Sequence, residues 1–219
     1  MEISPDSNII WKWKWLVLND TILFTWLIMA VITFLSFFIT RKDTKALAFL
    51  EILIVYIRDQ IRQITGQKPD IYLPFIGTLF LFISISNLLI IIPGYQPPTG
   101  SLSTTAALAV IVFFAVPVYG IFQQGLLGYL KRYVQPSFLM LPFHIMGELS
   151  RTLALAVRLF GNIMSGSLIA AAVLLIAPFF LPVVLQLLSL LIGQIQAYIF
   201  AVLAMIYIAS GIEIVKKTK

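Results

Sequence analysis

One arginine, Arg158, lies in the apolar run LALAVRLFGNIMSG, where no residue within one helical turn is acidic. Insertion scales put the cost of an arginine at the middle of a membrane at about 2.5 to 3.5 kcal/mol, because the charge loses its water. Snorkelling to an interface would lower this cost, but a central position in a long helix with Asn162 one turn away makes it difficult. The run therefore predicts that the counter-charge of Arg158 lies on another molecule.

Polar side chains gather on one face of a helix drawn through this run. At 100° per residue, four of them fall within about 60° of one another: Arg151, Arg158, Asn162 and Ser165. Glu148 lies about 80° to one side of Arg158, and Ser167 falls on the opposite face. For Glu148 and Arg151, a structural ion pair and a functional role are equally open, whereas His144 is expected to be an interfacial residue.

A second polar face follows in the last apolar run. Its members are Ser189, Gly193, Gln196 and Tyr207, with Gln194 and Tyr198 off that face. Gln196 alone would be unremarkable, because amides often hold membrane helices together. The serines could likewise be ordinary packing residues. Neutral hydroxyls and amides can also solvate a passing sodium ion or hold a chain of water, although none exchanges a proton near neutral pH. Five residues qualify: Ser165, Ser167, Ser189, Gln194 and Gln196.

The composition indicates an integral membrane protein. Of the 219 residues, 60% are hydrophobic and 11% are charged, and the mean hydropathy is +1.01. Several apolar runs reach the ~20 residues that a spanning helix needs, and strands with alternating polar positions are absent, which predicts an all-α polytopic membrane protein. The basic residues behind the net charge of +6 flank these runs, so they are topology signals rather than a nucleic-acid surface. The absence of cysteine excludes disulfides and thiolate metal sites.

We expect one membrane domain over residues 1–219. Residues 1–19 mix tryptophan with lysine, as segments at the headgroup level do. A first span over 20–40 is too long for the apolar region of a cleaved signal peptide. An amphipathic helix on the cytoplasmic surface is predicted at 43–68, and the second and third spans, the third at about 106–122, lie within 71–122.

The last part of the chain, 142–215, predicts two overlong helices joined at the sequence APFFLP. The first has about 36 residues and would be roughly 54 Å long, whereas a direct crossing needs only about 30 Å. Both helices must therefore tilt strongly as a hairpin, giving about five membrane-embedded helices plus the surface helix. Basic clusters at 41–45, 131–132 and 216–219 place the N-terminus outside and the C-terminus in the cytoplasm.

Two motifs carry a specific family resemblance. LALAVRLFGNIMSG and GQIQAYIFAVLAMIYIA closely resemble the segments that mark subunit a of the membrane sector of F-type ATP synthases, and SNLLIIIPGYQPPTGSLSTTAALA is similar to that family's second span and outer loop. The resemblance extends from about Leu47 to the C-terminus. The segment MGELSRTLALAVRLFGNIMSG and the short N-terminus resemble most the alternate, sodium-type branch.

The resemblance implies a role for each matching residue. Arg158 would be the essential stator arginine, with Asn162 and Gln196 as polar neighbours, in a hairpin that curves around a ring of c subunits and borders two offset aqueous half-channels. The missing counter-charge would be the ring carboxylate. Implied partners are the c-subunit ring, the b-subunit stator, the rest of the ATP synthase complex and the lipid bilayer, in a bacterial plasma membrane. No cofactor, catalytic site or firmly assigned metal site is implied.

Two positions depart from the family pattern. Many members carry a glutamate or histidine where this chain has Ser167, and a histidine or acid where it has Ser189. Neither serine titrates near neutral pH, which leaves Glu148 as the membrane-proximal acid of the hairpin. The coupling ion, proton or sodium, is therefore open.

Two other classes of protein use intramembrane polar residues. A secondary transporter usually shows repeated halves and broken helices, and the sequence has no internal repeat. A non-transporting scaffold would explain the apolar content but not the combination of Arg158, Asn162 and Gln196. A nucleotide-hydrolysing role is not expected, because no phosphate-binding glycine loop is present.

Overall fold

A computed structural model describes residues 9–13, 16–41, 45–65, 69–92, 95, 97–134, 140–176 and 181–213. The expected turn APFFLP lies largely outside these ranges, and so does the basic cluster at 216–219. Five helices of the described chain are long and apolar enough to cross a membrane, which confirms the all-α polytopic class. They are α1 (Asp20–Arg41), α3 (Leu73–Leu88), α4 (Leu102–Val134), α5 (Met140–Ile176) and α6 (Leu181–Glu213).

Shorter elements connect these helices. The helix α2 (Lys45–Thr65) occupies the stretch where the sequence predicts an amphipathic surface helix. The single-turn 3₁₀ helices η1 (Pro69–Ile71) and η2 (Leu89–Ile91) flank α3, and η3 (Pro98–Gly100) precedes α4. Proline at the first or second position of α3 and of η3 fits this arrangement, because a helix start leaves that amide unbonded in any case.

A small hairpin precedes the first helix. Strand β1 (Ile9–Trp13) pairs antiparallel with β2 (Leu16–Asn19), and Trp13 lies opposite Leu16. The composition of this segment predicted an interfacial location but did not predict strands. The alternation of tryptophan and lysine in IIWKW has the two-residue period of a strand, and aromatic residues favour strands.

The fourth helix is longer than the span expected at about 106–122. It reaches Val134, but it consists of two helical pieces. Gly125, with φ +74° and ψ 163°, forms the kink between them. Only glycine enters this backbone region readily. Beyond the kink, Tyr129 folds against Gly120, where an added Cβ would come within 2.7 Å of the ring.

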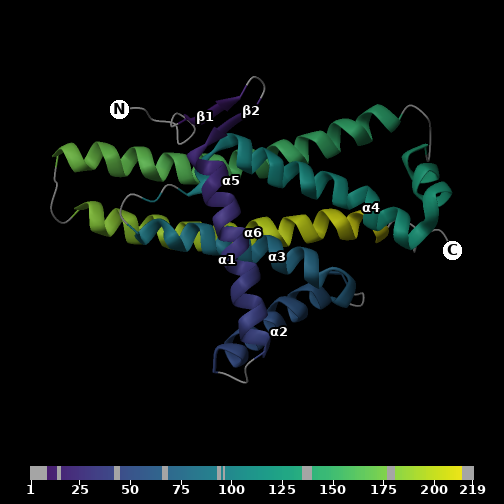
Figure 1. The fold of residues 1–219 in the computed structure, drawn as a ribbon. Helices are drawn as coiled ribbons and strands as arrows, with labels where there is room; N and C mark the ends of the chain where they lie inside the picture. The colour runs from purple at the N-terminus through teal and green to yellow at the C-terminus, as the bar shows by residue number, and fades with distance from the viewer. Residues whose placement is uncertain are drawn as a thin grey trace.

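The helices α3, α4, α5 and α6 lie side by side, and α1 runs across them (Figure 1). The contacts pair α4 with α5, α3 with α6, and α5 with α6. The hairpin β1–β2 lies at one end of α1 and α2 lies at the other. If α1 spans the bilayer directly, α5 and α6 are steeply inclined, which agrees with their excess length.

One apolar core holds this arrangement together. It draws at least one fully buried side chain from each of five helices: Ile61 of α2, Ile83 of α3, Val112 of α4, Leu159 of α5 and Phe200 of α6. By contrast, large side chains of α1 such as Trp26 and Phe34 are 61% and 65% exposed. An apolar surface of this kind is what a helix surrounded by lipid presents.

Candidate functional site

Arg158 lies on the exposed side of α5, with its guanidinium turned away from the core. Its neighbours Leu155 and Leu159 are 1% and 0% exposed, so the helix buries one face and presents Arg158 on another. Within the described part of the chain, Arg158 has neither a hydrogen bond nor an ion pair. Any partner of this charge therefore lies outside those residues.

Two hydroxyls that follow Arg158 along α5 are bonded to the backbone of their own helix. Ser165 donates to the carbonyl oxygen of Asn162 at 3.1 Å, and Ser167 donates to that of Met164 at 2.8 Å. Both serines are exposed, and Asn162 is half-buried. Their protons are thus engaged, whereas the hydroxyl oxygens remain available as acceptors on the surface of α5.

Gln196 is the buried polar group of α6. It is 6% exposed, and its side-chain nitrogen has no hydrogen-bond partner among the described residues. A buried amide left without a partner costs about 1 to 3 kcal/mol. Such a group is expected to meet water or another molecule.

Two contacts fix how α5 and α6 run past each other. Gly166 of α5 lies against Ser189 of α6, where an added Cβ would come within 3.1 Å of the serine hydroxyl. Farther along the pair, the guanidinium carbon of Arg151 lies 5.6 Å from the centre of the Tyr207 ring. Because α5 gains residue number toward the first contact while α6 loses it, the two helices are antiparallel.

The predicted residues fall between these two contacts. Arg158 and Asn162 lie between Arg151 and Gly166 on α5, and Gln196 lies between Ser189 and Tyr207 on α6. Two antiparallel helices with equal rise per residue therefore hold Asn162 and Gln196 at about the same level. The motifs RLFGN and IQAYIF meet in the middle of the hairpin.

A second polar group lies toward one end of the pair. Glu148, Arg151, Thr152 and Tyr207 line a hollow of about 10 Å³ together with side chains of α4. The hydroxyl of Thr152 donates to the backbone carbonyl of Glu148 at 2.9 Å. A space of that size is close to the minimum that holds one water molecule.

A third polar group lies toward the other end, and most of it was not predicted. The side-chain amide of Asn87, which is 1% exposed, donates to the carbonyl oxygen of Gly193 at 2.8 Å, and Thr99 donates to the amide oxygen of Asn87 at 2.7 Å. Next to them, Gln194 donates to the carbonyl of Ser84 at 2.9 Å, and the Ser84 hydroxyl donates back to the Gln194 oxygen. The polar residues in SISN, inside an apolar run, were the signal for this group.

Metal-ligating side chains do not gather here. Over the part of the chain that the structure describes, no group of three or more histidine, cysteine, aspartate or glutamate residues could hold a metal ion. Between Glu148 and Ile176 on α5 and between Leu181 and Tyr207 on α6, the polar side chains are hydroxyls, amides, two arginines and one carboxylate. This set can carry water or accept a transient cation, and it can bind an anionic partner at Arg158.

Comparison with known proteins decides the family. The model of the family described as ATP synthase A chain matches residues 22–209, which include every polar group described above. The chain belongs to this family, that of subunit a of the F-type ATP synthases. It is similar to ATP synthase subunit a 2 of Acaryochloris marina, with 54% identity over 98% of this chain and 94% of the relative.

Other family members are almost as similar. ATP synthase subunit a of Nitrosospira multiformis is 52% identical over 96% of this chain and 86% of its own length. ATP synthase subunit a of Albidiferax ferrireducens is 54% identical over 96% of this chain and 94% of its own length. With five apolar helices long enough to span in its described part, this member of the subunit a family is a multi-pass protein of a bacterial plasma membrane.

Proposed function

We propose that this subunit a is the stationary partner of a rotating c-subunit ring, and that Arg158 faces the ring carboxylate. The observation that carries the proposal is an exposed guanidinium without a partner in the described chain, at the centre of a long apolar helix. Both helices of the pair also expose aliphatic side chains, including Val157 at 58% and Leu153 at 64% on α5 and Ile195 at 51% on α6. Such a face suits an equally apolar ring.

The chemistry follows from the charge of Arg158. A ring carboxylate must be neutral while it faces lipid, by protonation or by a bound sodium ion, because its ionised form is heavily penalised there. Opposite a guanidinium the ionised form is favoured, so the bound ion leaves. Arginine keeps its charge at any relevant pH and so blocks direct leakage past this point. Each elementary charge that crosses 100 mV delivers about 2.3 kcal/mol for rotation.

The two polar groups that flank Arg158 are candidates for the two half-channels. One contains Asn87, Thr99 and Gln194, and lies between Ser189 and Gln196 along α6. The other is the hollow at Glu148 and Arg151. Their separation along the α5–α6 pair supports offset entry and exit paths, because an ion that enters by one must ride the ring to reach the other.

The coupling ion is proposed to be sodium, as in the alternate branch of the family. Ser167 and Ser189 offer neutral oxygens at positions where many members carry titratable groups. Vesicles that contain the whole complex should take up labelled sodium on addition of ATP, and a protonophore should leave this uptake unchanged or raise it. If the protonophore abolishes sodium uptake, and if the vesicles acidify without sodium when the protonophore is absent, the complex translocates protons.

The role of Arg158 is tested by substitution in the assembled complex. Arg158→Ala should abolish ion-driven ATP synthesis while the complex still assembles, because the guanidinium makes no hydrogen bond or ion pair within the described residues. Arg158→Lys should also fail, since lysine loses its proton more readily when desolvated and lacks the planar fork. Phe34→Ala, an exposed change on α1 and outside the hairpin, serves as the control. Normal ATP synthesis by an assembled Arg158→Ala complex would contradict the proposed role of Arg158. The alternative functions, a non-transporting scaffold or another kind of transporter, would then remain.

The remaining partners and the orientation belong to the same proposal. We expect the b-subunit stator and the rest of the ATP synthase complex to bind this chain, with the N-terminus outside and the C-terminus in the cytoplasm. The positive-inside distribution of lysine and arginine supports this orientation.

A further inference from the structure

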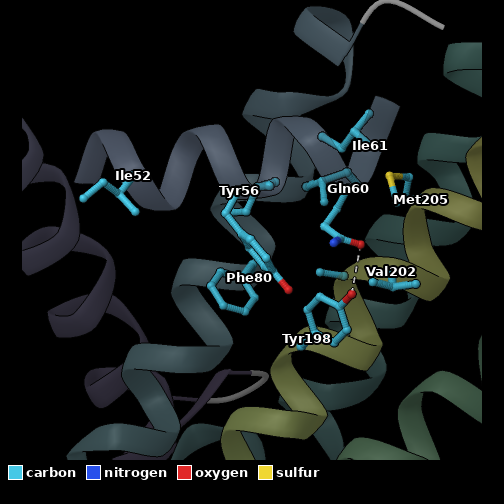
Figure 2. A pocket seen from close by; sticks show the side chains of 11 residues that line it. Ile52, Tyr56, Gln60, Ile61, Phe80, Tyr198, Val202 and Met205 are labelled. Atoms are coloured by element: carbon cyan, nitrogen blue, oxygen red, sulfur yellow. Dashed lines mark hydrogen bonds between the residues drawn. The ribbon is translucent and has the colours of Figure 1, made fainter. Parts of the chain in front are cut away.

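A cavity of about 330 Å³ lies between α2, α3 and α6, and none of its lining residues belongs to the candidate site (Figure 2). Its floor is fully inside the protein, because Ile61 and Met205 are 0% and 2% exposed. Its rim is open, because Ile52 and Tyr56 are 69% and 55% exposed. The cavity therefore connects the outer surface of α2 with the core.

The chemistry of the wall excludes a polar ligand. The described lining residues include no charged side chain, and nearly all of them are aliphatic or aromatic. The polar groups are the amide of Gln60 and the hydroxyls of Tyr56 and Tyr198. Tyr198 donates to the Gln60 oxygen at 3.1 Å, so this pair ties α2 to α6 and does not require a ligand (Figure 2). What enters must be hydrocarbon.

The membrane around the cavity rim indicates which hydrocarbon could enter it. The rim is apolar and belongs to a membrane protein, where the medium around an apolar surface is lipid acyl chains. An empty space of this size would forfeit the dispersion contacts of its lining. A protein segment that entered would bring backbone N–H and C=O groups into a wall that cannot pair them. A flexible acyl chain has no such groups.

We propose that this cavity holds one acyl chain of a membrane phospholipid, inserted from the leaflet beside α2. The hydroxyls of Tyr56 and Tyr198 and the amide of Gln60 are its polar end, suited to the ester region of the lipid. Tyr198 is on the turn of α6 that carries Gln196. The bound acyl chain would therefore pack between α2 and the middle of the α5–α6 hairpin. The proposal requires membrane location alone and does not depend on the role of Arg158.

The experiment uses the whole ATP synthase complex in phosphatidylethanolamine vesicles that contain a small fraction of phospholipid with a photoreactive diazirine near the end of one acyl chain. After illumination, mass spectrometry of peptides should find adducts on Met205 or Ile61, which ordinary lipid contact cannot reach. Ala201→Phe fills the cavity and should abolish these adducts, whereas Val184→Phe, an exposed position of α6 outside the cavity, should retain them.

A second variant covers the case in which Ala201→Phe fails to assemble. Val202→Leu enlarges a half-buried lining residue by one methylene and should reduce the adducts in a complex that assembles normally. Wild-type complexes with adducts at Val184 but none at Met205 or Ile61 would overturn the proposal. Adducts at Met205 that persist in both filling variants would overturn it as well. Crosslinking of a Tyr56→Cys variant to another subunit, with Met205 unlabelled, would assign the cavity to a protein partner instead.

Discussion

Asn87 of α3 donates its side-chain amide to the carbonyl oxygen of Gly193 of α6 across 2.8 Å, and the two helices touch at this point. An added Cβ at Gly193 would come within 3.1 Å of the Asn87 Cβ and 3.3 Å of its amide nitrogen. The absent side chain of Gly193 is therefore what lets a buried amide reach the backbone of α6. This contact joins the group of polar residues on α3 to the helix that carries Gln196.

We predict that Gly193→Ala destabilises the protein by about 1 to 3 kcal/mol, because the inserted methyl group forces α3 and α6 apart. The measurement is the midpoint of unfolding of the purified complex in detergent. Gly77→Ala is the matched control on α3, where an added Cβ meets nothing within 4 Å. That variant should be neutral or more stable by up to about 1 kcal/mol, since alanine favours a helix over glycine. Equal stability of both variants would contradict the close approach at Gly193.

The kink in α4 gives a second prediction. Gly125 has φ +74° with open space around its Cα, so its requirement for glycine is a matter of backbone conformation rather than crowding. Gly125→Ala should cost about 1 to 3 kcal/mol of unfolding free energy. Gly147→Ala, in the regular helix α5 and equally uncrowded, should be neutral or stabilising. If Gly125→Ala were as stable as Gly147→Ala, α4 would pass through this region as a regular helix.

Much of the helical layout could be predicted, since long apolar runs leave a membrane protein few alternatives. The break at Gly125 could not, because a single glycine in an apolar run does not by itself end a helix in a membrane. The helical wheel grouped Gly193 with Gln196 but could not say which helix they face. Asn87 lies 106 residues before Gly193, so no local pattern connects them.

Tyr95, in the loop before α4, gives a pH prediction. Burial raises the pKa of the Tyr95 hydroxyl above its usual value of 10. Above pH 10 the unfolded chain releases this proton while the folded chain keeps it, so stability falls as pH rises, by at most about 1.4 kcal/mol per pH unit. Below pH 10 the group has no effect. Tyr95→Phe lacks this titration, so the unfolding free energy of the wild type minus that of the variant should fall with this slope when both are measured between pH 9 and about pH 11. Parallel curves would mean that Tyr95 is accessible to water.

The orientation in the membrane is open to a labelling test, because the natural chain contains no cysteine. Gly100 is buried in the loop before α4, so a probe belongs instead at Ser103, which is exposed at the start of α4. Ser103→Cys should react with an impermeant maleimide from the outside, and Asp59→Cys on exposed α2 should react only from the cytoplasmic side. Reaction of both cysteines from the same side would overturn the proposed topology.

The contact between Gly166 and Ser189 separates packing from ion conduction in the hairpin. An added Cβ at Gly166 would lie 3.1 Å from the Ser189 hydroxyl but 3.7 Å from its Cβ, so the hydroxyl alone causes the crowding. Gly166→Ala should therefore destabilise the protein, and Ser189→Ala in the same chain should relieve the effect. The coupling in this double-mutant cycle should be about 0.5 to 3 kcal/mol.

Ion translocation by the same four proteins distinguishes the two roles of Ser189. If the hydroxyl lines a half-channel, ATP-driven ion uptake should fall in Ser189→Ala and stay low in the double variant, although the double variant regains its stability. If Ser189 only packs against α5, uptake should follow stability and recover in the double variant. The second result would remove Ser189 from the proposed path but not Gln194 or Gln196, because Gln194 bonds to Ser84 and Gln196 lies about two turns farther along α6.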